Sequence, residues 1–292
     1  PASWARASAT SRPAPASTCP SGVHIGYLIE SARSQAEQNL PRNPLVKLFR
    51  NIALCWLFKR HWRLELVALP LRIYQKTGLR AFLHKIGFFK LLPKSIAFME
   101  ALPPDDLKTP FRRTIPDVIH PRGEEKARVG YFLGCMMSIL FNKTTRATVN
   151  VLHRSGCTVI TPKAIRCCGA PLMSEGFKHK AVDIMKFNID LFDSLEVDYI
   201  VTDCAACGAA LKEYREIFED DPDYHEKAQR FSGKVREITQ FLAEWPHTAP
   251  VEKPPFDTPQ KAIYDQPCHL CHAQQIWEQP IKVIQSVPGV EL

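Results

Sequence analysis

The chain has 292 residues, of which 45% are hydrophobic and 23% charged, which is typical of a globular protein of one to three domains. Its 10 cysteines and the absence of a secretory signal in residues 1–20 argue against a disulfide scaffold, so we expect a reducing, cytoplasmic setting and metal-binding cysteines. The net charge of +8 indicates a solvated face or a docking surface for an acidic partner; no zinc-finger or RNA-binding motif points to nucleic acid.

The first part of the chain is expected to hold no sheet. Residues 1–18 are rich in Ala, Ser and Pro and are predicted to be disordered. Residues 19–100 are predicted to be mainly helical, with breaks at Pro70 and Pro93. Apolar residues recur there near helical spacing: Leu45, Leu48, Phe49, Ile52 and Leu57. The proline-rich segment 101–127 is expected to be a linker. The longest apolar run, Ile52 to Phe58, is too short to span a bilayer.

From residue 128 the pattern changes to short apolar runs that alternate with helical segments. The expected strands are 129–133, 157–160 and 199–201, and the expected helices are 138–155, 181–192 and 206–218. Strands that alternate with helices predict an α/β fold with a parallel sheet, here within a module of residues 128–250.

A second copy of this pattern begins near the end of the chain. The positions that share one spacing are Arg128, Tyr131 and Cys135 in the first copy and Lys261, Tyr264 and Cys268 in the second. In both copies a strand-like run leads to a cysteine. We therefore expect residues 251–292 to be the start of a second, truncated module.

Five cysteines of the first module form the main candidate site. Cys135 is separated by 31 residues from Cys167 and Cys168, and these are separated by a further 35 residues from Cys204 and Cys207. Each group falls at or shortly after the end of an expected strand. Because the carboxyl ends of parallel strands share one edge of a sheet, the five thiols are predicted to meet at one centre. Helices that begin at this edge favour the thiolate form.

Five thiolates exceed the four ligands of one tetrahedral zinc and suit a four-iron cluster better. Gly169 lets the backbone come close to a cluster sulfur, and Lys163 and Arg166 offset negative charge. A structural zinc site and incidental thiols are the alternatives. Cys55 and Cys157 lie within apolar runs and are interpreted as small core residues.

These motifs resemble the cysteine-rich "CCG" module of the heterodisulfide reductase B subunit and, more closely, the iron–sulfur subunit of glycolate oxidase (glycolate dehydrogenase). The supporting stretches are CPSGV from Cys19, GYFLGCMMSILF from Gly130, RATVNVL from Arg146, CCGA from Cys167, CGAALKEY from Cys207 and PCHLCHAQ from Pro267. The resemblance extends from about residue 18 to the end of the chain.

The resemblance implies an electron-transfer subunit with an iron–sulfur cluster, whose flavoprotein partner carries FAD or FMN and oxidises a 2-hydroxy acid. Electrons would then pass to a quinone or another acceptor, with the protein at the inner face of the membrane. The chain has no G-x-G-x-x-G fingerprint of its own, which agrees with a flavin in the partner. Residues 41–100 would pack on the module, dock on the flavoprotein or lie on a membrane surface.

Two other readings of the same motifs stay open. One is a relative of heterodisulfide reductase, or a subunit that serves lactate or glycerol-3-phosphate oxidation. The other is an interaction module stabilised by zinc, which metal analysis would distinguish from a four-iron protein.

The chain departs from the family pattern at three places. Cys19 matches the last ligand of a ferredoxin motif, but Arg12 and Pro15 stand where cysteines are expected, so we predict that the ferredoxin clusters are absent. Leu172 and Ser174 replace histidines that often follow the CCGA motif of the glycolate branch. The second module stops before its cysteine pair.

One further group of potential ligands lies in the second module. Cys268, His269, Cys271 and His272 are candidates for half of a second cluster site, for a zinc site, or for an unoccupied loop. Four ligands this close in sequence cannot easily all reach one tetrahedral ion.

Overall fold

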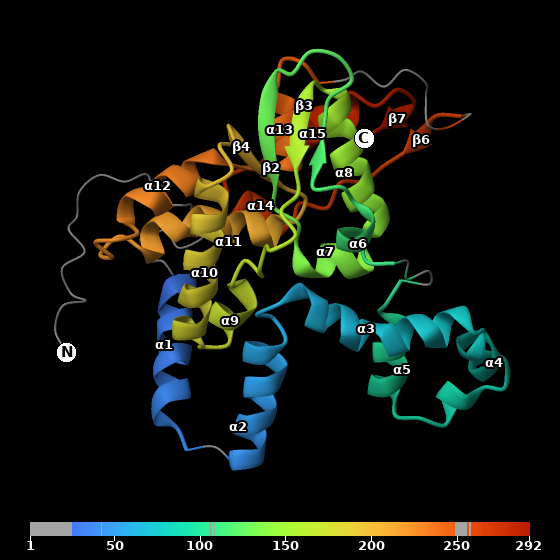
Figure 1. Ribbon diagram of the computed structural model, residues 1–292. Coiled ribbons are helices and arrows are strands. Elements are labelled where there is room, and N and C mark those ends of the chain that lie inside the picture. Colours follow the sequence, from blue (N-terminus) through green and yellow to red (C-terminus); the bar gives the residue numbers. More distant parts are fainter. Residues whose placement is uncertain (1–24, 42, 105–106, 108, 249–255, 257) are drawn as a thin grey trace.

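The computed structural model describes residues 25–41, 43–104, 107, 109–248, 256 and 258–292. The segment predicted to be disordered, 1–18, and Cys19 lie outside the described residues. The structure has a helical N-terminal part followed by an α/β part, which confirms the predicted fold class (Figure 1).

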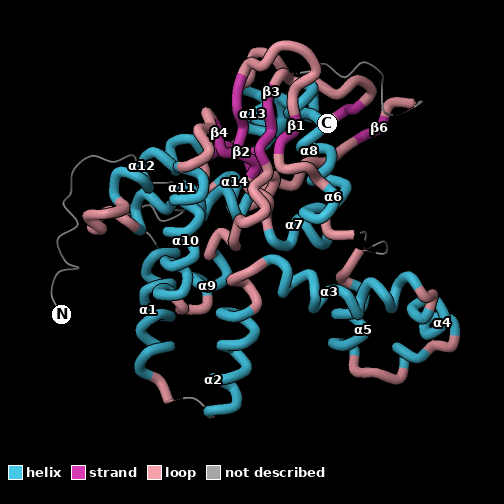
Figure 2. Tube along the Cα trace, viewed as in Figure 1, coloured by secondary structure: helices cyan, strands magenta, loops and turns pink. Residues whose placement is uncertain are grey.

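The N-terminal part is entirely helical within its described residues. Its elements are α1 (Ile25–Asn39), α2 (Pro44–Arg50), η2 (Asn51–Trp56), α3 (His61–Lys76), α4 (Leu79–Lys85), η3 (Phe88–Lys90) and α5 (Lys94–Ala101). α1 and the α2–η2 segment run side by side beneath the sheet, whereas α4 and α5 stand away from it (Figure 2).

The predicted helix break at Pro93 is confirmed, because this residue immediately precedes α5. The predicted break at Pro70 is wrong, because Pro70 lies inside α3. A proline removes one backbone hydrogen bond to the residue four positions earlier, here the exposed Leu66, whose carbonyl group water can satisfy. The other breaks fall at Gly78 and Gly87, which both have a φ of 74°.

The sheet of the α/β part has five strands in the order β1-β3-β2-β4-β5. The strands are β1 (Val118–Ile119), β2 (Ala127–Tyr131), β3 (Cys157–Ile160), β4 (Tyr199–Thr202) and β5 (Val235–Glu237). The last four are parallel, as predicted, whereas β1 is an antiparallel edge strand on β3. The segment 101–127, expected to be a linker, thus contributes β1 and the short helix α6 (Phe111–Thr114).

Helices cover both faces of the sheet (Figures 1 and 2). They are α7 (Cys135–Leu140), α8 (Asn142–Arg154), α9 (Ala170–Ser174), α10 (Lys178–Asp193), α11 (Ala205–Ile217), α12 (His225–Lys234) and α13 (Ile238–Glu244). Side chains alternate between the two faces along β2: Tyr131 packs in the core beneath α6, α8 and α13, and Phe132 in the core beneath α10, α11 and α12. The α/β part is therefore a three-layer structure.

The helix predicted over 138–155 is divided into α7 and α8 at Phe141, which leaves the helical conformation at φ −116° and ψ 42°. The cause is Asn142, whose buried side-chain amide donates to the carbonyl oxygens of Ser138 (3.0 Å) and Ile139 (3.2 Å). These bonds satisfy the last carbonyls of α7 and allow the chain to start a new helix.

The second copy of the pattern folds like the start of the first. It comprises β6 (Gln260–Lys261), α14 (Cys268–Cys271), α15 (Glu278–Gln285) and β7 (Val290–Glu291). In the parallel pair β6–β7, Lys261 faces Glu291, just as Arg128 faces Thr158 in the parallel pair β2–β3. Both second strands follow a glycine of positive φ, Gly156 at 83° and Gly289 at 80°. The repeat therefore includes the register of the strands as well as the sequence spacing.

Candidate metal centre

Two thiols of the site, Cys135 and Cys204, lie just after the central strands β2 and β4. The chain leaves β2 toward β3 on one side and later returns to β4 on the other side, so the strand order changes direction between β2 and β4. Ligands of open α/β sheets bind at the carboxyl end of such a switch point. Cys135 follows β2 as the first residue of α7, and Cys204 follows β4 as the N-cap of α11, a helix of 13 residues.

Cys167 and Cys168 reach the same place from the loop that follows β3. The sulfur atoms of Cys135 and Cys167 are 4.0 Å apart. Interactions that shift the pKa values of the thiols link Cys167 to Cys168, Cys168 to Cys207 and Cys207 to Cys204. The structure therefore brings the five predicted thiols together in one continuous row.

These contacts divide the thiols into donors and acceptors of hydrogen bonds. Hydrogen bonds from Cys167 and Cys207 hold the pKa of Cys168 well below its usual value. A hydrogen bond from Cys207 likewise lowers the pKa of Cys204, although burial opposes this. Cys207 has a pKa well above its usual value, because Cys168 and Cys204 favour its protonated form and because it is buried. Two thiols of the row, Cys168 and Cys204, are thus prepared to be thiolates, the form that binds metal.

The turn at the paired cysteines is fixed by two buried side chains that the sequence analysis missed. The amide of Asn188 in α10 donates to the carbonyl oxygen of Cys167 (2.9 Å), and the hydroxyl of Tyr214 in α11 donates to that of Cys168 (2.8 Å). Both are fully buried. Tyr214 lies in the CGAALKEY stretch, but the sequence alone gives no sign that its hydroxyl reaches across to the paired cysteines.

Gly169 completes this turn in a conformation that other residues rarely adopt. Its φ is 89°, and a Cβ atom built on it would lie 2.7 Å from the Cε atom of Met185. Glycine is therefore required by backbone conformation and by packing against α10. The predicted approach of the Gly169 backbone to a cluster sulfur stays a prediction.

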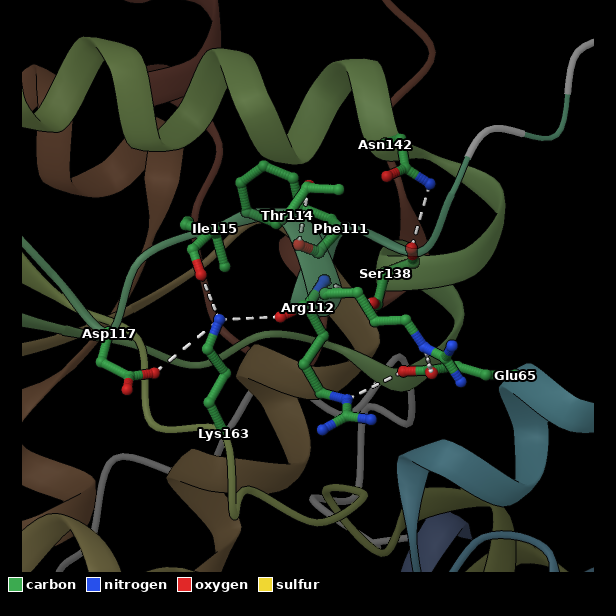
Figure 3. Close-up of polar contacts among 10 residues, drawn as sticks. Glu65, Phe111, Arg112, Thr114, Ile115, Asp117, Ser138, Asn142 and Lys163 are labelled. Atoms are coloured by element: carbon green, nitrogen blue, oxygen red, sulfur yellow. Dashed lines mark hydrogen bonds and ion pairs between the residues drawn. The ribbon is translucent and has the colours of Figure 1, made fainter.

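The predicted offset of negative charge by Lys163 and Arg166 stays a prediction, and the structure places both side chains in other contacts. The amino group of Lys163 binds the carbonyl oxygens of Arg112 (2.8 Å) and Ile115 and lies 3.7 Å from Asp117, so it caps α6 (Figure 3). The guanidinium group of Arg166 stacks on the ring of Phe187 at 3.6 Å. Neither ammonium nor guanidinium group is engaged with the thiols.

A second polar cluster clamps the helical part onto this edge of the sheet. The carboxylate of Glu65 in α3, 2% exposed, binds the side chains of Arg112 (2.8 Å) and Arg113 (2.6 Å) in α6. The backbone N–H of Arg112 in turn donates to the hydroxyl of Ser138 in α7 (3.3 Å), as Figure 3 shows. Glu65 therefore links α3 through α6 to the helix that begins at Cys135.

The donor set fits a multi-iron cluster. Within the described residues, no three Cys, His, Asp or Glu side chains converge closely enough to hold one metal ion. A row of five thiols suits a cluster, in which thiolates bind different iron atoms and the sulfurs are more widely spaced. The nine cysteines of the described part are all free thiols. Cys157 is one of them: it is fully buried in β3, as predicted for a core residue, and burial raises its pKa to about 12.

The candidate ligands of the second module do not converge. Cys271 is buried, whereas Cys268, His269 and His272 are exposed. α14 lies against α11, and the side chain of Gln274 just beyond α14 donates to the carbonyl oxygen of Ala205 (2.8 Å). This segment therefore covers the start of α11 beside Cys204, without forming a four-ligand zinc site.

Comparison with known proteins agrees with this geometry. Residues 129–212 match the family described as "Cysteine-rich domain" (CCG), and residues 45–102 match the family described as "Glycolate oxidase iron-sulfur subunit, linker region". The first match contains all five clustered cysteines, and the second covers α2 to α5. No solved structure matches the chain.

The relatives carry related names. The chain is 32% identical over 274 residues to the "Probable glycolate oxidase iron-sulfur subunit" of Bacillus subtilis, a match that covers 94% of this chain and 61% of that protein. It is 34% identical over 165 residues to "Lactate utilization protein A" of Geobacillus thermodenitrificans, covering 56% of this chain and 67% of the relative. The chain belongs to the cysteine-rich CCG family, together with the glycolate oxidase iron–sulfur subunit and lactate utilization protein A.

Proposed function

We propose that this chain is the iron–sulfur electron-transfer subunit of a flavin-dependent 2-hydroxy-acid dehydrogenase. In this proposal Cys135, Cys167, Cys168, Cys204 and Cys207 hold a four-iron cluster. The observation that carries it is the continuous row of five thiols at the switch point of the sheet. Such a cluster, when bound, accepts and donates single electrons.

The protein side of this function is to hold the thiols and to control their access to water. Cys167 is 1% exposed and Cys168 4%, whereas Cys204 is only partly buried. Asn188 and Tyr214 fix the backbone of the paired cysteines. Burial of Cys167 and Cys168 would exclude water from one side of the cluster. The partly exposed Cys204 would leave the other side open for electron exchange.

Glycolate is the 2-hydroxy acid that we propose as substrate of the complex. The match to the glycolate oxidase subunit covers nearly the whole chain, including the helical part. Lactate is the second candidate, because lactate utilization protein A of Geobacillus thermodenitrificans has the higher identity over the part that it matches. In either case FAD or FMN in a flavoprotein partner would oxidise the acid, and a quinone or another acceptor would receive the electrons.

The experiment is to purify the chain anaerobically together with its flavoprotein partner and to add glycolate, lactate or glycerol 3-phosphate. Bleaching of the visible iron–sulfur absorption by one 2-hydroxy acid is the expected result. The matched controls are Cys168→Ser, which should abolish the response, and Cys157→Ser, which should keep it. An iron-loaded complex that none of these acids reduces would contradict the proposed function.

We further propose that the helical part lies on an anionic membrane surface at the cytoplasmic face, where a quinone would be accessible. Residues 40–102 carry twelve lysines and arginines but only two acidic residues, so this segment holds more than the chain's net charge of +8. Both acidic residues are neutralised internally, Glu65 by Arg112 and Arg113, and Glu100 by Arg80. Arg50 is paired with Glu37 and Glu175 outside the segment, and the segment keeps a large excess of basic residues over acidic ones.

Large apolar side chains are exposed between these basic residues. They include Leu45, Phe49, Trp56, Trp62, Leu66, Val67, Phe82, Leu91, Phe98 and Leu102. The guanidinium group of Arg63 stacks on the exposed rings of Trp56 and Trp62, at 4.4 and 5.4 Å. Mixed basic and apolar surface is typical of proteins that bind the headgroup region of anionic bilayers. Within the described residues no helix is long and apolar enough to span a bilayer.

Co-sedimentation with vesicles tests this surface. The protein should pellet with vesicles containing anionic phosphatidylserine and remain in solution with neutral phosphatidylcholine, and high salt should release it. A variant with Trp56→Ser and Trp62→Ser should bind less. Equal binding to both kinds of vesicle would contradict the membrane proposal. If the flavoprotein partner in addition bound the wild type but not the double tryptophan variant, the surface would be a docking site for that partner.

A further inference from the structure

His61 is a buried histidine in α3, the helix that packs against α7, which begins at Cys135. It is the first residue of α3 and is 4% exposed. Neither ring nitrogen has a hydrogen-bond partner among the described residues. A buried N–H group without an acceptor is unfavourable, so this ring is suited to donate to something that joins it at this position.

The helix that carries His61 packs against the thiol-bearing edge of the sheet. α3 contacts α7, whose first residue is Cys135. Leu64, one turn beyond His61, lies in the same hydrophobic core as Cys135, Cys167 and Cys168. In Figure 1, α3 begins below α7. The start of α3 therefore belongs to the surroundings of the site.

The charged groups near His61 determine its protonation state and indicate which of the five thiols influences it. Burial, reinforced by the nearby charge of Arg112, lowers the pKa of His61 to about 4, although Glu65 and Cys168 act in the opposite direction. The ring is therefore neutral near pH 7, with one N–H donor and one acceptor nitrogen. Of the five thiols, Cys168 is the one whose charge acts on His61.

The position of His61 is fixed by its own helix. Glu65 lies one turn further along α3 and is held by Arg112 and Arg113, and Arg112 is tied to Ser138 (Figure 3). These contacts hold the part of α3 that carries His61 in place without depending on the cluster.

We propose that the ring N–H of His61 donates a hydrogen bond to sulfur at the Cys168 side of the cluster, so that the helical part helps to set the reduction potential. This inference rests on the cluster of the proposed function. A hydrogen bond to sulfur stabilises the more negative, reduced state and therefore raises the potential. His61 is a positioning and tuning residue in this account, and it takes no part in the chemistry of the 2-hydroxy acid.

The test is a dye-mediated redox titration of the iron-loaded protein, with iron per chain measured in parallel. His61→Phe should shift the ratio of reduced to oxidised cluster about tenfold toward oxidised at a fixed potential, which is 59 mV for a one-electron couple. His61→Gln keeps an N–H donor and should restore part of this shift. The matched control is His84→Phe, which removes an exposed histidine paired with Glu100 in the same helical part and should leave the potential unchanged.

An unchanged potential in His61→Phe would overturn the inference, and so would equal shifts in the Phe and Gln variants, because the donor would then be irrelevant. Loss of iron from the Phe variant alone supports the inference, whereas equal loss from both would indicate a packing role and overturn it. A wild-type protein without iron would instead overturn the proposed function. The two failures are therefore distinguishable.

Discussion

Replacing Tyr214 with Phe removes a single hydroxyl group from the support of the paired cysteines. That hydroxyl is fully buried and donates to the carbonyl oxygen of Cys168 at 2.8 Å. The phenyl ring keeps its packing, so the loss is confined to the hydrogen bond and to a buried carbonyl left without a donor. Such a loss costs about 1–3 kcal/mol, which is roughly a 5- to 150-fold change in an equilibrium constant.

The free energy of unfolding from urea titration measures this cost, and the rate of iron release to a chelator shows whether the turn has loosened. Tyr224→Phe is the matched control, because its hydroxyl donates to Asp190 (2.7 Å) at an exposed site and should cost less than about 1 kcal/mol. Faster iron release is expected in Tyr214→Phe only. Equal effects of the two variants would refute the view that Tyr214 holds the cysteine turn.

Two further substitutions test the turn and the clamp. Gly169→Ala should destabilise the fold by about 2–4 kcal/mol, because φ is 89° and the new Cβ atom would collide with Met185. The control Gly123→Ala, at a φ of 106° with open space around it, should cost only about 1–2 kcal/mol. Equal losses of stability in the two variants would show that the collision with Met185 has no effect. Glu65→Gln should cost about 1.5–3 kcal/mol at pH 7. Burial alone would raise the pKa of Glu65, but bonds from Arg112 and its neighbour lower it, so this stability is complete above about pH 4.5 and is lost as the pH falls through the lowered value. Acid titration of urea stability checks this, and an unchanged pH profile in Glu65→Gln would contradict it.

The sheet and the thiol site could be predicted because both depend on local patterns. Buried parallel strands appear as short apolar runs, and β3 begins and ends at the predicted residues, 157 and 160. The thiols follow those strands, so the parallel arrangement alone was enough to bring Cys135 and Cys204 to one edge. The equal sequence spacing around Cys135 and Cys268 is likewise accompanied by the same strand register in the pairs β2–β3 and β6–β7.

Other features depend on contacts between residues distant in the sequence. β1 and β5 have two and three residues, too few to give a pattern of their own. The end of α7 at Phe141 is decided by the side chain of Asn142, and the acceptors of Lys163 belong to α6, about fifty residues earlier in the chain. The predicted domain boundaries at residues 100, 127 and 250 remain predictions.

The hydrogen-bonding roles of the residues around the site could not be predicted from the sequence for the same reason. Asn188 and Tyr214 have helical spacing with apolar residues of their own helices, but the sequence does not show that they bind the carbonyl oxygens of the paired cysteines. Glu65 lies between two leucines, and nothing in the sequence marks its charged side chain as buried. His61 follows two basic residues and resembles part of a charged surface. Only the packing shows that it is buried, in a helix that contacts α7.

Iron and sulfide per chain, measured after anaerobic purification of the wild type, Cys168→Ser and Cys157→Ser, test the central claim most directly. The account predicts about four irons per chain in the wild type, a clear loss in Cys168→Ser with the sheet still folded, and wild-type iron in Cys157→Ser, whose thiol lies in the strand core. One zinc per wild-type chain, full iron in Cys168→Ser, or equal iron loss in both variants would contradict it.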